Sequence, residues 1–180
     1  MMSSLPSDAD LFAALRKRTQ KADEDGPPAP LGPDEVGADA MGPQEVVTYI
    51  MRSLKVDQGE DKVGLKALMS FAVKYDDGRA EDTLGQVQPG HFTSPAAFAE
   101  YLSSEPRYQT LNELSEWKPM GQPDFSNMSK MAAQKLLVRR EGGNWEELFI
   151  NMQLAEVGGD QGGLPRRRWL ITSIYKQGTA

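Results

Sequence analysis

The sequence predicts an α+β fold in which three helices pack on a curved antiparallel sheet. Two observations carry this prediction. Apolar residues recur at helical spacing between residues 43 and 105, and from residue 131 onward they alternate with polar residues between glycine-rich turns. The helices come first and the hairpins follow, so the elements do not alternate as they would in a parallel α/β sheet.

The first 42 residues predict an N-terminal arm made of a short amphipathic helix and a flexible acidic linker. Ser7 can cap this helix, and basic residues gather near its end, where cations are favoured. Its apolar stripe consists of Leu11, Phe12 and Leu15. Residues 23–42 are rich in acids, proline and glycine, a composition that buries too little apolar surface to offset chain entropy. We therefore assign residues 1–42 to the arm and residues 43–180 to one folded domain.

Three helices are expected in the first half of the domain. The first begins at Pro43, because a missing N–H is tolerated at the first helical position. The second covers residues 62–74. The third follows the cap residue Ser94 and cannot continue past Pro106.

Strands are expected in the second half. The segment from Leu111 to Trp117 predicts a first strand or extended segment. Glycine-rich turns then separate three longer strands, because glycine adopts the positive φ of hairpin turns at little steric cost. These strands are predicted over residues 131–140, 145–154 and 167–176.

Composition excludes several classes of site. The chain has 180 residues, no cysteine and one histidine, which excludes disulfides, thiolate metal sites and multi-histidine metal sites. No apolar run approaches the length of a membrane helix. The 26 acidic residues outnumber the 20 basic ones, so nucleic acid is not an expected partner. No metal and no cofactor are expected, since the acidic turn at residues 76–82 lacks EF-hand spacing and the glycine runs do not precede helices.

Charge is distributed unevenly along the chain. Residues 1–42 hold 8 acids and 4 bases, residues 43–129 hold 13 acids and 8 bases, and residues 130–180 hold 5 acids and 8 bases. Within the basic last third, Arg166, Arg167 and Arg168 stand together at the start of the last strand. They are expected either to keep an edge strand soluble or to dock an acidic partner, a phosphate-bearing ligand or an anionic headgroup.

Three segments resemble the nuclear transport factor 2-like superfamily, also called SnoaL-like or ketosteroid-isomerase-like. They are the helix start at residues 42–47, the helix at residues 98–102 with its Pro106-Arg107-Tyr108 continuation, and the closing strand at residues 168–175. More narrowly, they resemble an uncharacterised plant and algal family of that fold, many members of which are plastid-targeted. The resemblance covers residues 43–177. It implies a cone-shaped sheet closed by helices, a plastid location in the stroma or at the thylakoid, and a photosynthetic complex as the partner to test first.

Candidate catalytic residues are few. His91 is the only side chain whose ordinary pKa lies near neutrality, and Glu100, Tyr101 or Tyr108 could approach it in space. The competing interpretation, which we favour, is a loop histidine in a turn with no catalytic partner. Trp117, Trp145 and Trp169 are expected to pack in the core or at its rim.

Two functions remain open from the sequence. The first is a non-enzymatic binding or accessory subunit that docks a protein partner through the sheet, the basic strand and the N-terminal arm, with Leu11, Phe12 and Leu15 lying in a groove of the partner. Peripheral membrane association and a homodimer stay open alongside it, as does a cytoplasmic location. The alternative is a small-molecule enzyme of the isomerase or dehydratase kind that uses the cone pocket with His91 as its acid or base.

Overall fold

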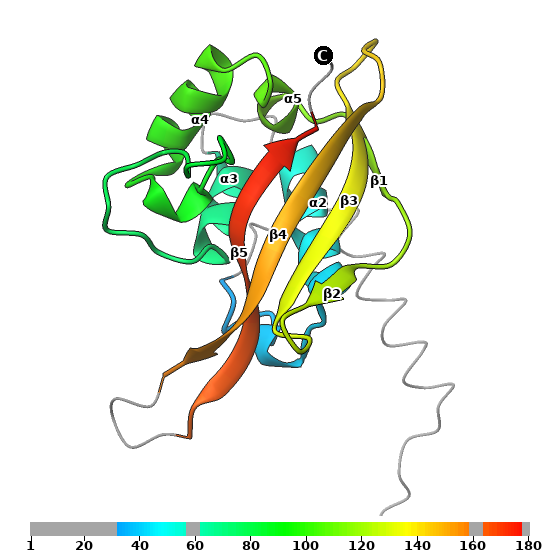
Figure 1. The fold of residues 1–180 in the computed structure, drawn as a ribbon. Coiled ribbons are helices and arrows are strands. Elements are labelled where there is room, and N and C mark those ends of the chain that lie inside the picture. The colour runs from blue at the N-terminus through cyan, green and yellow to red at the C-terminus, as the bar shows by residue number, and fades with distance from the viewer. Residues whose placement is uncertain (1–31, 57–61, 159–163, 178–180) are drawn as a thin grey trace, which may run out of the picture.

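The computed structural model describes residues 32–56, 62–158 and 164–177, and these form an α+β fold with helices on a curved antiparallel sheet. Figure 1 shows the sheet in front of helices α2 and α3, with α4 and α5 beside its upper end. The prediction of an α+β class is therefore confirmed. The cone of the nuclear transport factor 2-like superfamily stays a prediction, and the predicted N-terminal helix lies outside the described residues.

The three predicted helices are present. Their bounds, with those of the shorter helices between them, are η1 Ala38–Ala40, α2 Pro43–Val56, α3 Val63–Ser70, η2 Pro89–His91, α4 Pro95–Ser104 and α5 Gln109–Asn112. The cap at Ser94 is confirmed, because its hydroxyl accepts a hydrogen bond from the backbone N–H of Ala97 at 3.1 Å. Helix α3 ends four residues earlier than predicted. The chain after it turns onto the sheet, where the Val73 N–H donates to the Ile171 carbonyl.

The predicted first strand is wrong in part. Leu111 lies in helix α5, and the strand β1 covers Glu116–Pro119 instead. Both Leu111 and Leu114 are buried, and a spacing of three residues places two side chains on one side of a helical turn. That spacing favours a helical turn over an alternating strand.

The sheet has five antiparallel strands in the order β1-β3-β4-β5, with β2 paired to the far part of β3. The remaining bounds are β2 Asp124–Ser126, β3 Met131–Arg139, β4 Glu146–Val157 and β5 Arg166–Lys176. The two predicted hairpins of long strands are confirmed. A register shift at Asn151/Met152 marks a β-bulge between β4 and β5. At the outer edge of β5, Ala72 and Val87 form isolated bridges with Ile171 and Ile174.

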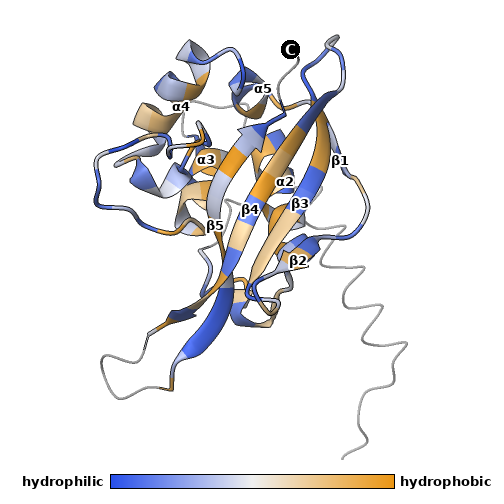
Figure 2. Cartoon of the chain, viewed as in Figure 1, coloured by the Kyte–Doolittle hydropathy of each residue, from blue (hydrophilic) through white to orange (hydrophobic). Residues whose placement is uncertain are grey.

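Alternation along the strands gives the sheet two different sides. On the side that faces the helices, the side chains are at most 3% exposed and join the core with the apolar faces of α2, α3 and α4. They are Ala132, Gln134, Leu136, Val138, Leu148, Ile150, Met152, Ile171 and Ile174. Figure 2 shows the matching alternation of apolar and polar positions along the strands.

Residues 32–42, which composition assigns to the linker, pack on the domain. Ala38 is fully buried in the core, and Val36 and Met41 lie against it. Asp34 and Asp39 bind arginines of β5. The ordered domain therefore includes this segment, because three small or apolar side chains are enough to anchor a stretch that is otherwise rich in glycine, proline and acids.

Candidate protein-binding surface

The side of the sheet that faces away from α2 and α3, which we call the open face, is built from cross-strand rows. The pairing register places Met131, Gln153 and Leu170 in one row, then Ala133, Asn151 and Ser173, then Lys135, Phe149 and Tyr175, and finally Leu137 and Glu147. Of these side chains, Met131 is exposed, Ser173 is buried and the others are half-buried. None of the helices in the described part of the chain lies in front of this side of the sheet (Figure 1).

An aromatic pair occupies the middle of the upper half of the open face. The rings of Phe149 and Tyr175 stack with centroids 4.6 Å apart and planes 7° apart. The ammonium of Lys135 lies 5.6 Å from the Phe149 ring and 2.9 Å from a carboxylate oxygen of Glu147. The charge of Lys135 beside the aromatic pair is therefore paired, and no helix of the described residues covers the two rings.

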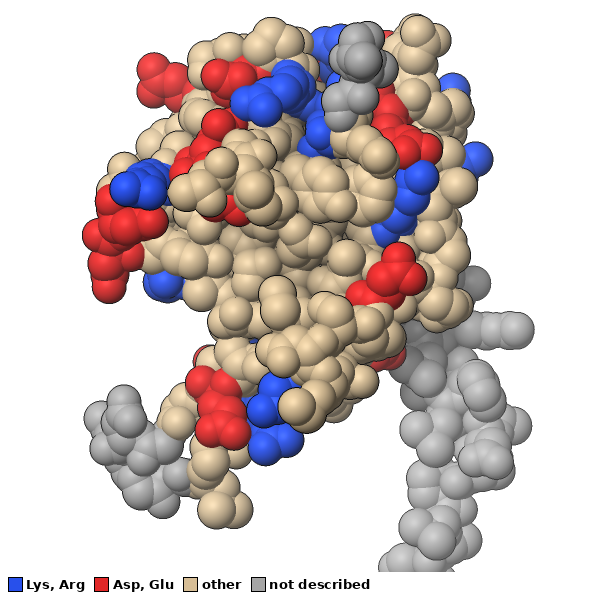
Figure 3. Space-filling view, in the orientation of Figure 1, with Lys and Arg blue, Asp and Glu red and all other residues tan. Residues whose placement is uncertain are grey.

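Charged side chains lie mostly around this surface rather than on it. In Figure 3, which views the open face, the centre is largely uncharged and the Lys, Arg, Asp and Glu side chains gather toward the periphery. Trp145 stands at the rim of the sheet, 38% exposed, with Arg139 and Lys118 over its ring at 4.6 and 4.9 Å. An uncharged centre with a charged rim is the arrangement that protein interfaces favour.

A polar hollow lies across the lower half of the open face, where the loop between α3 and η2 meets the sheet. Its volume is about 350 Å³, within the range of ligand pockets. The lining residues come from that loop, from the β2–β3 hairpin and from β4 and β5. They are Tyr75, Asp82, Gln86, Gln88, Ser126, Met131, Ala132, Ala133, Asn151, Thr172 and Ser173.

Hydrogen bonds join the loop to the sheet inside the hollow. The Asn151 amide donates to the Gln86 side-chain oxygen at 3.0 Å, and the Ser173 hydroxyl donates to the same oxygen at 2.6 Å. The Tyr75 hydroxyl donates to the Thr172 carbonyl at 3.2 Å. Burial raises the pKa of Tyr75, and the charges of Asp82 and Asp77 raise it further, so its hydroxyl is neutral at physiological pH.

His91 does not meet the two tyrosines that were its candidate partners. Its Nδ1 lies 3.7 Å from a carboxylate oxygen of Asp77, beyond hydrogen-bond distance, and its ring packs edge-on against Phe92. It lines neither the hollow on the open face nor the hollow near the β3–β4 turn. His91 is the last residue of η2, and its buried Nδ1 has no hydrogen-bond partner among the described residues.

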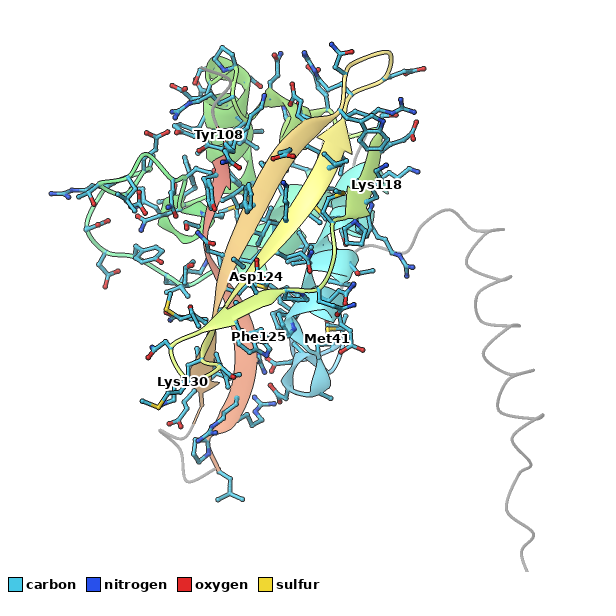
Figure 4. All side chains as sticks on the ribbon, turned by 45° about the vertical axis from the view of Figure 1, so that its right-hand side comes forward. Met41, Tyr108, Lys118, Asp124, Phe125 and Lys130 are labelled. Carbon is cyan, nitrogen blue, oxygen red and sulfur yellow. The ribbon has the colours of Figure 1, made fainter. Side chains whose placement is uncertain are left out.

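Tyr101 and Tyr108 belong to a different cluster. Tyr101 donates its hydroxyl to Glu81 at 2.5 Å, and Arg107 binds the same carboxylate oxygen at 2.8 Å. Tyr108 donates to the Gly85 carbonyl at 3.1 Å. Burial raises the pKa of Tyr101, and the bond to Glu81 raises it further, so this tyrosine is a neutral donor and not a base. Figure 4 shows Tyr108 at the end of the sheet opposite Phe125 and Lys130.

The three arginines of β5 do not form one free basic patch. Arg168 has a side chain only 8% exposed, and its guanidinium binds Asp34 at 2.8 Å and Asp39 at 2.7 Å. Arg166 binds the same two carboxylates at 3.2 and 3.3 Å. Arg167, 68% exposed, faces Glu156 at 3.4 Å. The carboxylates that these three arginines contact belong to the chain itself. The other candidate binding residues, Leu11, Phe12 and Leu15, lie outside the described residues.

The enzyme alternative requires a pocket between the helices and the sheet, and side chains fill that space. Leu136, Ile150 and Ile174 at its centre are fully buried. A larger hollow of about 490 Å³ lies elsewhere, near the β3–β4 turn, and mixes Lys55, Lys62 and Arg140 with Glu113 and Glu141.

Sequence reasoning did not find the hollow or the aromatic pair. The alternation of β4 places Phe149 on the side opposite Leu148 and Ile150, so the sequence pattern could have predicted that Phe149 lies on the open face. No sequence pattern could have predicted the hollow, because Gln86 and Ser173 are 87 positions apart and no periodicity relates them.

The described residues contain no group of three or more His, Cys, Asp or Glu placed to hold a metal ion. No helix in the same residues is long and apolar enough to cross a membrane. Comparisons of the chain with protein-family models, with curated proteins and with solved structures found no match.

Proposed function

We propose that this protein is a non-enzymatic binding or accessory subunit that docks a protein partner through the open face of its sheet. The observation that carries the proposal is the stacked pair of Phe149 and Tyr175, presented on a side of the sheet that no described helix covers. A sheet normally buries one side and solvates the other through polar residues. Here the second side carries an aromatic pair and apolar residues among its polar ones.

Aromatic side chains supply much of the energy of protein interfaces, because they bury a large area at a small cost in conformational entropy. Leu137, in the next row, extends the apolar area at one end of the aromatic pair, and the polar hollow at the other end gives a partner hydrogen-bonding groups. The surface therefore suits a partner with an apolar patch and polar groups at its border. The N-terminal arm as a second contact, the plastid location and the photosynthetic complex stay predictions.

The test is co-purification with a matched pair of surface variants. The full chain, tagged and produced in the cells it comes from, is compared with Phe149→Ser and with Arg167→Ala, whose side chain is 68% exposed and belongs to none of the rows that define the open face. We expect the same proteins to co-purify with the wild type and with Arg167→Ala, and to be lost with Phe149→Ser. Equal melting temperatures of the three proteins show that the fold is intact.

A purified partner then gives the quantitative result. We expect Phe149→Ser to weaken its affinity by about 2 kcal/mol, roughly thirtyfold. Unchanged affinity would show that the open face is not the contact. Loss of the partner with Arg167→Ala alone would show instead that the partner binds at the basic start of β5. If light scattering finds a dimer of the wild type that Phe149→Ser converts to a monomer, the occupant of the open face is a second copy of the chain and the proposal of a separate partner is overturned.

A further inference from the structure

The N-terminal arm joins the domain close to one end of the open face. The described chain begins at residue 32, and Asp34 binds Arg168 at 2.8 Å and Arg166 at 3.2 Å at the start of β5. Arg168 lies two positions before Leu170, which belongs to the last row of the open face. Two residues of a strand span about 7 Å, so the arm is anchored beside this surface.

The linker of the arm is long enough to bring its predicted helix onto the open face. Residues 23–31 separate that helix from the described chain, and an extended segment of this length spans at most about 30 Å. Ser173, which lines the hollow, is five positions along β5 from Arg168, a distance of about 17 Å. The hollow therefore lies well within reach of the end of the predicted helix.

The apolar stripe of the predicted helix complements the aromatic pair on the sheet. Leu11, Phe12 and Leu15 fall within a sector of about 100° on a helix. The stacked rings of Phe149 and Tyr175 are covered by no helix of the described residues. Contact between the stripe and the rings removes apolar area from water on both sides, which is the main favourable term when an amphipathic helix docks.

The basic end of the predicted helix is opposite in charge to the loop beside the hollow. Four bases follow the stripe along the chain, namely Arg16, Lys17, Arg18 and Lys21. In the loop, residues 74–82 hold four carboxylates against two bases, and Asp76 and Asp77 are exposed. Tyr75 lines the hollow and binds the Thr172 carbonyl, so this acidic segment lies next to the open face. Attraction between the two segments favours docking in one direction.

The two contacts have matching spacing on the helix and on the sheet. At 1.5 Å per residue, the centre of the four bases lies about 8 Å along the helix from the centre of the stripe. On the sheet, the row of Ser173 lies about 7 Å from the row of Phe149 and Tyr175. The order also agrees, because linker, bases and stripe succeed one another in the arm as the start of β5, the hollow and the aromatic pair do along the sheet.

We propose that the predicted helix of the N-terminal arm, residues 7–22, lies on the open face of its own domain when no partner is bound. Its apolar stripe covers the pair of Phe149 and Tyr175, and its basic end faces the acidic loop. A partner that docks on the open face has to displace the helix, so its apparent affinity falls with the fraction of molecules whose open face is free. This consequence rests on the proposed function, whereas the contact between the arm and the sheet does not.

Photo-crosslinking in the full chain tests the contact without a partner. p-Benzoylphenylalanine is introduced in place of Phe12, the dilute protein is irradiated, and mass spectrometry identifies the cross-linked peptides. We expect cross-links within one chain to the segments of β4 and β5 that hold Phe149 and Tyr175. The control carries the same group in place of Ala13, on the opposite side of the predicted helix, and should give few of these cross-links.

Three results of this experiment would overturn the proposal. The first is the absence of cross-links to the open face, and the second is an equal yield from the two positions. The third is a cross-link between copies, detected by irradiating a mixture of isotope-labelled and unlabelled protein. That result would make a second chain the occupant of the open face.

A matched pair of full-chain variants tests the competition with the partner. Leu15→Asp places a charge in the apolar stripe, and Ala13→Asp adds the same charge on the other side of the predicted helix. With the helix bound in about nine-tenths of the molecules, Leu15→Asp should bind the purified partner about tenfold more tightly than the wild type, and Ala13→Asp should bind it equally. Weaker binding by Leu15→Asp would show that the arm contacts the partner instead, and unchanged binding would show that the arm does not compete.

The failure of this inference differs from the failure of the proposed function. If Phe149→Ser releases the partner and the group at position 12 gives no cross-links to the open face, the proposed function stands and the arm does not cover that face. If Phe149→Ser leaves the partner bound and the cross-links reach the open face, the arm occupies the sheet and the proposed function fails.

Discussion

The guanidinium of Arg168 connects residues that are 129 and 134 positions away in the chain, Asp39 and Asp34. Hydrogen bonds that involve charged groups contribute more than neutral ones when they are shielded from water. Arg168 is shielded, and it fixes the segment before α2 against β5. Its neighbour Arg167 has an exposed side chain and one longer contact, so the two arginines should differ in their effect on stability.

Replacing Arg168 by Ala is expected to lower the free energy of unfolding by about 1 to 2 kcal/mol, because two carboxylates lose a shielded partner. Arg167→Ala is the control and should stay within about 0.5 kcal/mol of the wild type, as exposed ion pairs contribute little. Chemical denaturation of both variants measures the difference. Equal effects would show that the bonds of Arg168 are not stabilising.

Acid should weaken the same contact. Hydrogen bonding to Arg168 lowers the pKa of Asp34, and the charges of Arg168 and Arg166 lower it further. A carboxylate whose pKa is lower in the folded than in the unfolded chain stabilises the fold above its unfolded pKa, which is about 3.9. That contribution is lost as the pH falls through the lower folded pKa.

The expected result concerns the difference between the wild type and Asp34→Asn. Melting temperatures should show the wild type more stable above about pH 5, and the difference should shrink below about pH 4. A difference between the wild type and Asp34→Asn that does not change with pH would contradict the assignment.

At the scale of elements, the loop between α3 and η2 depends on one close approach. A Cβ on Gly90 would lie 1.7 Å from the carbonyl oxygen of Val73 and 2.6 Å from its carbon. Val73 cannot move away freely, because its N–H donates to the Ile171 carbonyl of β5. Glycine at position 90 thus lets η2 pack on the chain that borders the hollow.

Gly90→Ala is therefore expected to lower the free energy of unfolding by about 3 kcal/mol and to disturb the N–H signals of Leu84 and Gln86. Gly78→Ala is the matched control in the same loop. Its Cβ would meet nothing within 4 Å, and the change costs only the strain of a positive φ, about 1 kcal/mol. If the two variants are equally stable, the close approach at Gly90 does not constrain the loop.

Hydrophobic periodicity predicted the elements that bury a long apolar stripe. Val46, Ile50 and Leu54 define α2, and the alternation around Leu148 and Ile150 defines β4, because each pattern extends over several turns or residue pairs. Helix α5 has four residues, too few for a period to be distinguished from a strand. The anchoring of residues 32–42 and the hollow were not predictable, because both depend on partners far away along the chain.

At the scale of the whole molecule, the charge asymmetry of the sequence is partly cancelled inside the fold. The acidic segment before α2 lies against the basic start of β5, so Asp34 and Asp39 neutralise arginines that composition alone places in a separate basic third. The domain therefore extends to residue 32 in the described chain, so a truncation at residue 42 removes part of it.

Two truncated proteins test this boundary. Removal of residues 1–31 keeps Asp34, Ala38 and Asp39, whereas removal of residues 1–42 uncovers the core at Ala38 and leaves Arg168 without its carboxylates. We expect the second protein to unfold with a free energy at least about 2 kcal/mol lower than the first, measured by denaturation. Equal stability would place the boundary at residue 43 instead.

The bridges at the outer edge of β5 determine which kind of recognition is open to this molecule. An unpaired edge strand can add a strand from another chain, a contact that depends mainly on backbone groups and tolerates many sequences. Here Phe71, Val73 and Val87 already use the N–H and carbonyl groups of Ile171 and Ile174. Strand addition is blocked at these positions, so a partner that docks on this part of the sheet must be selected by its side chains, and changes on either side can retune the pairing without altering the fold.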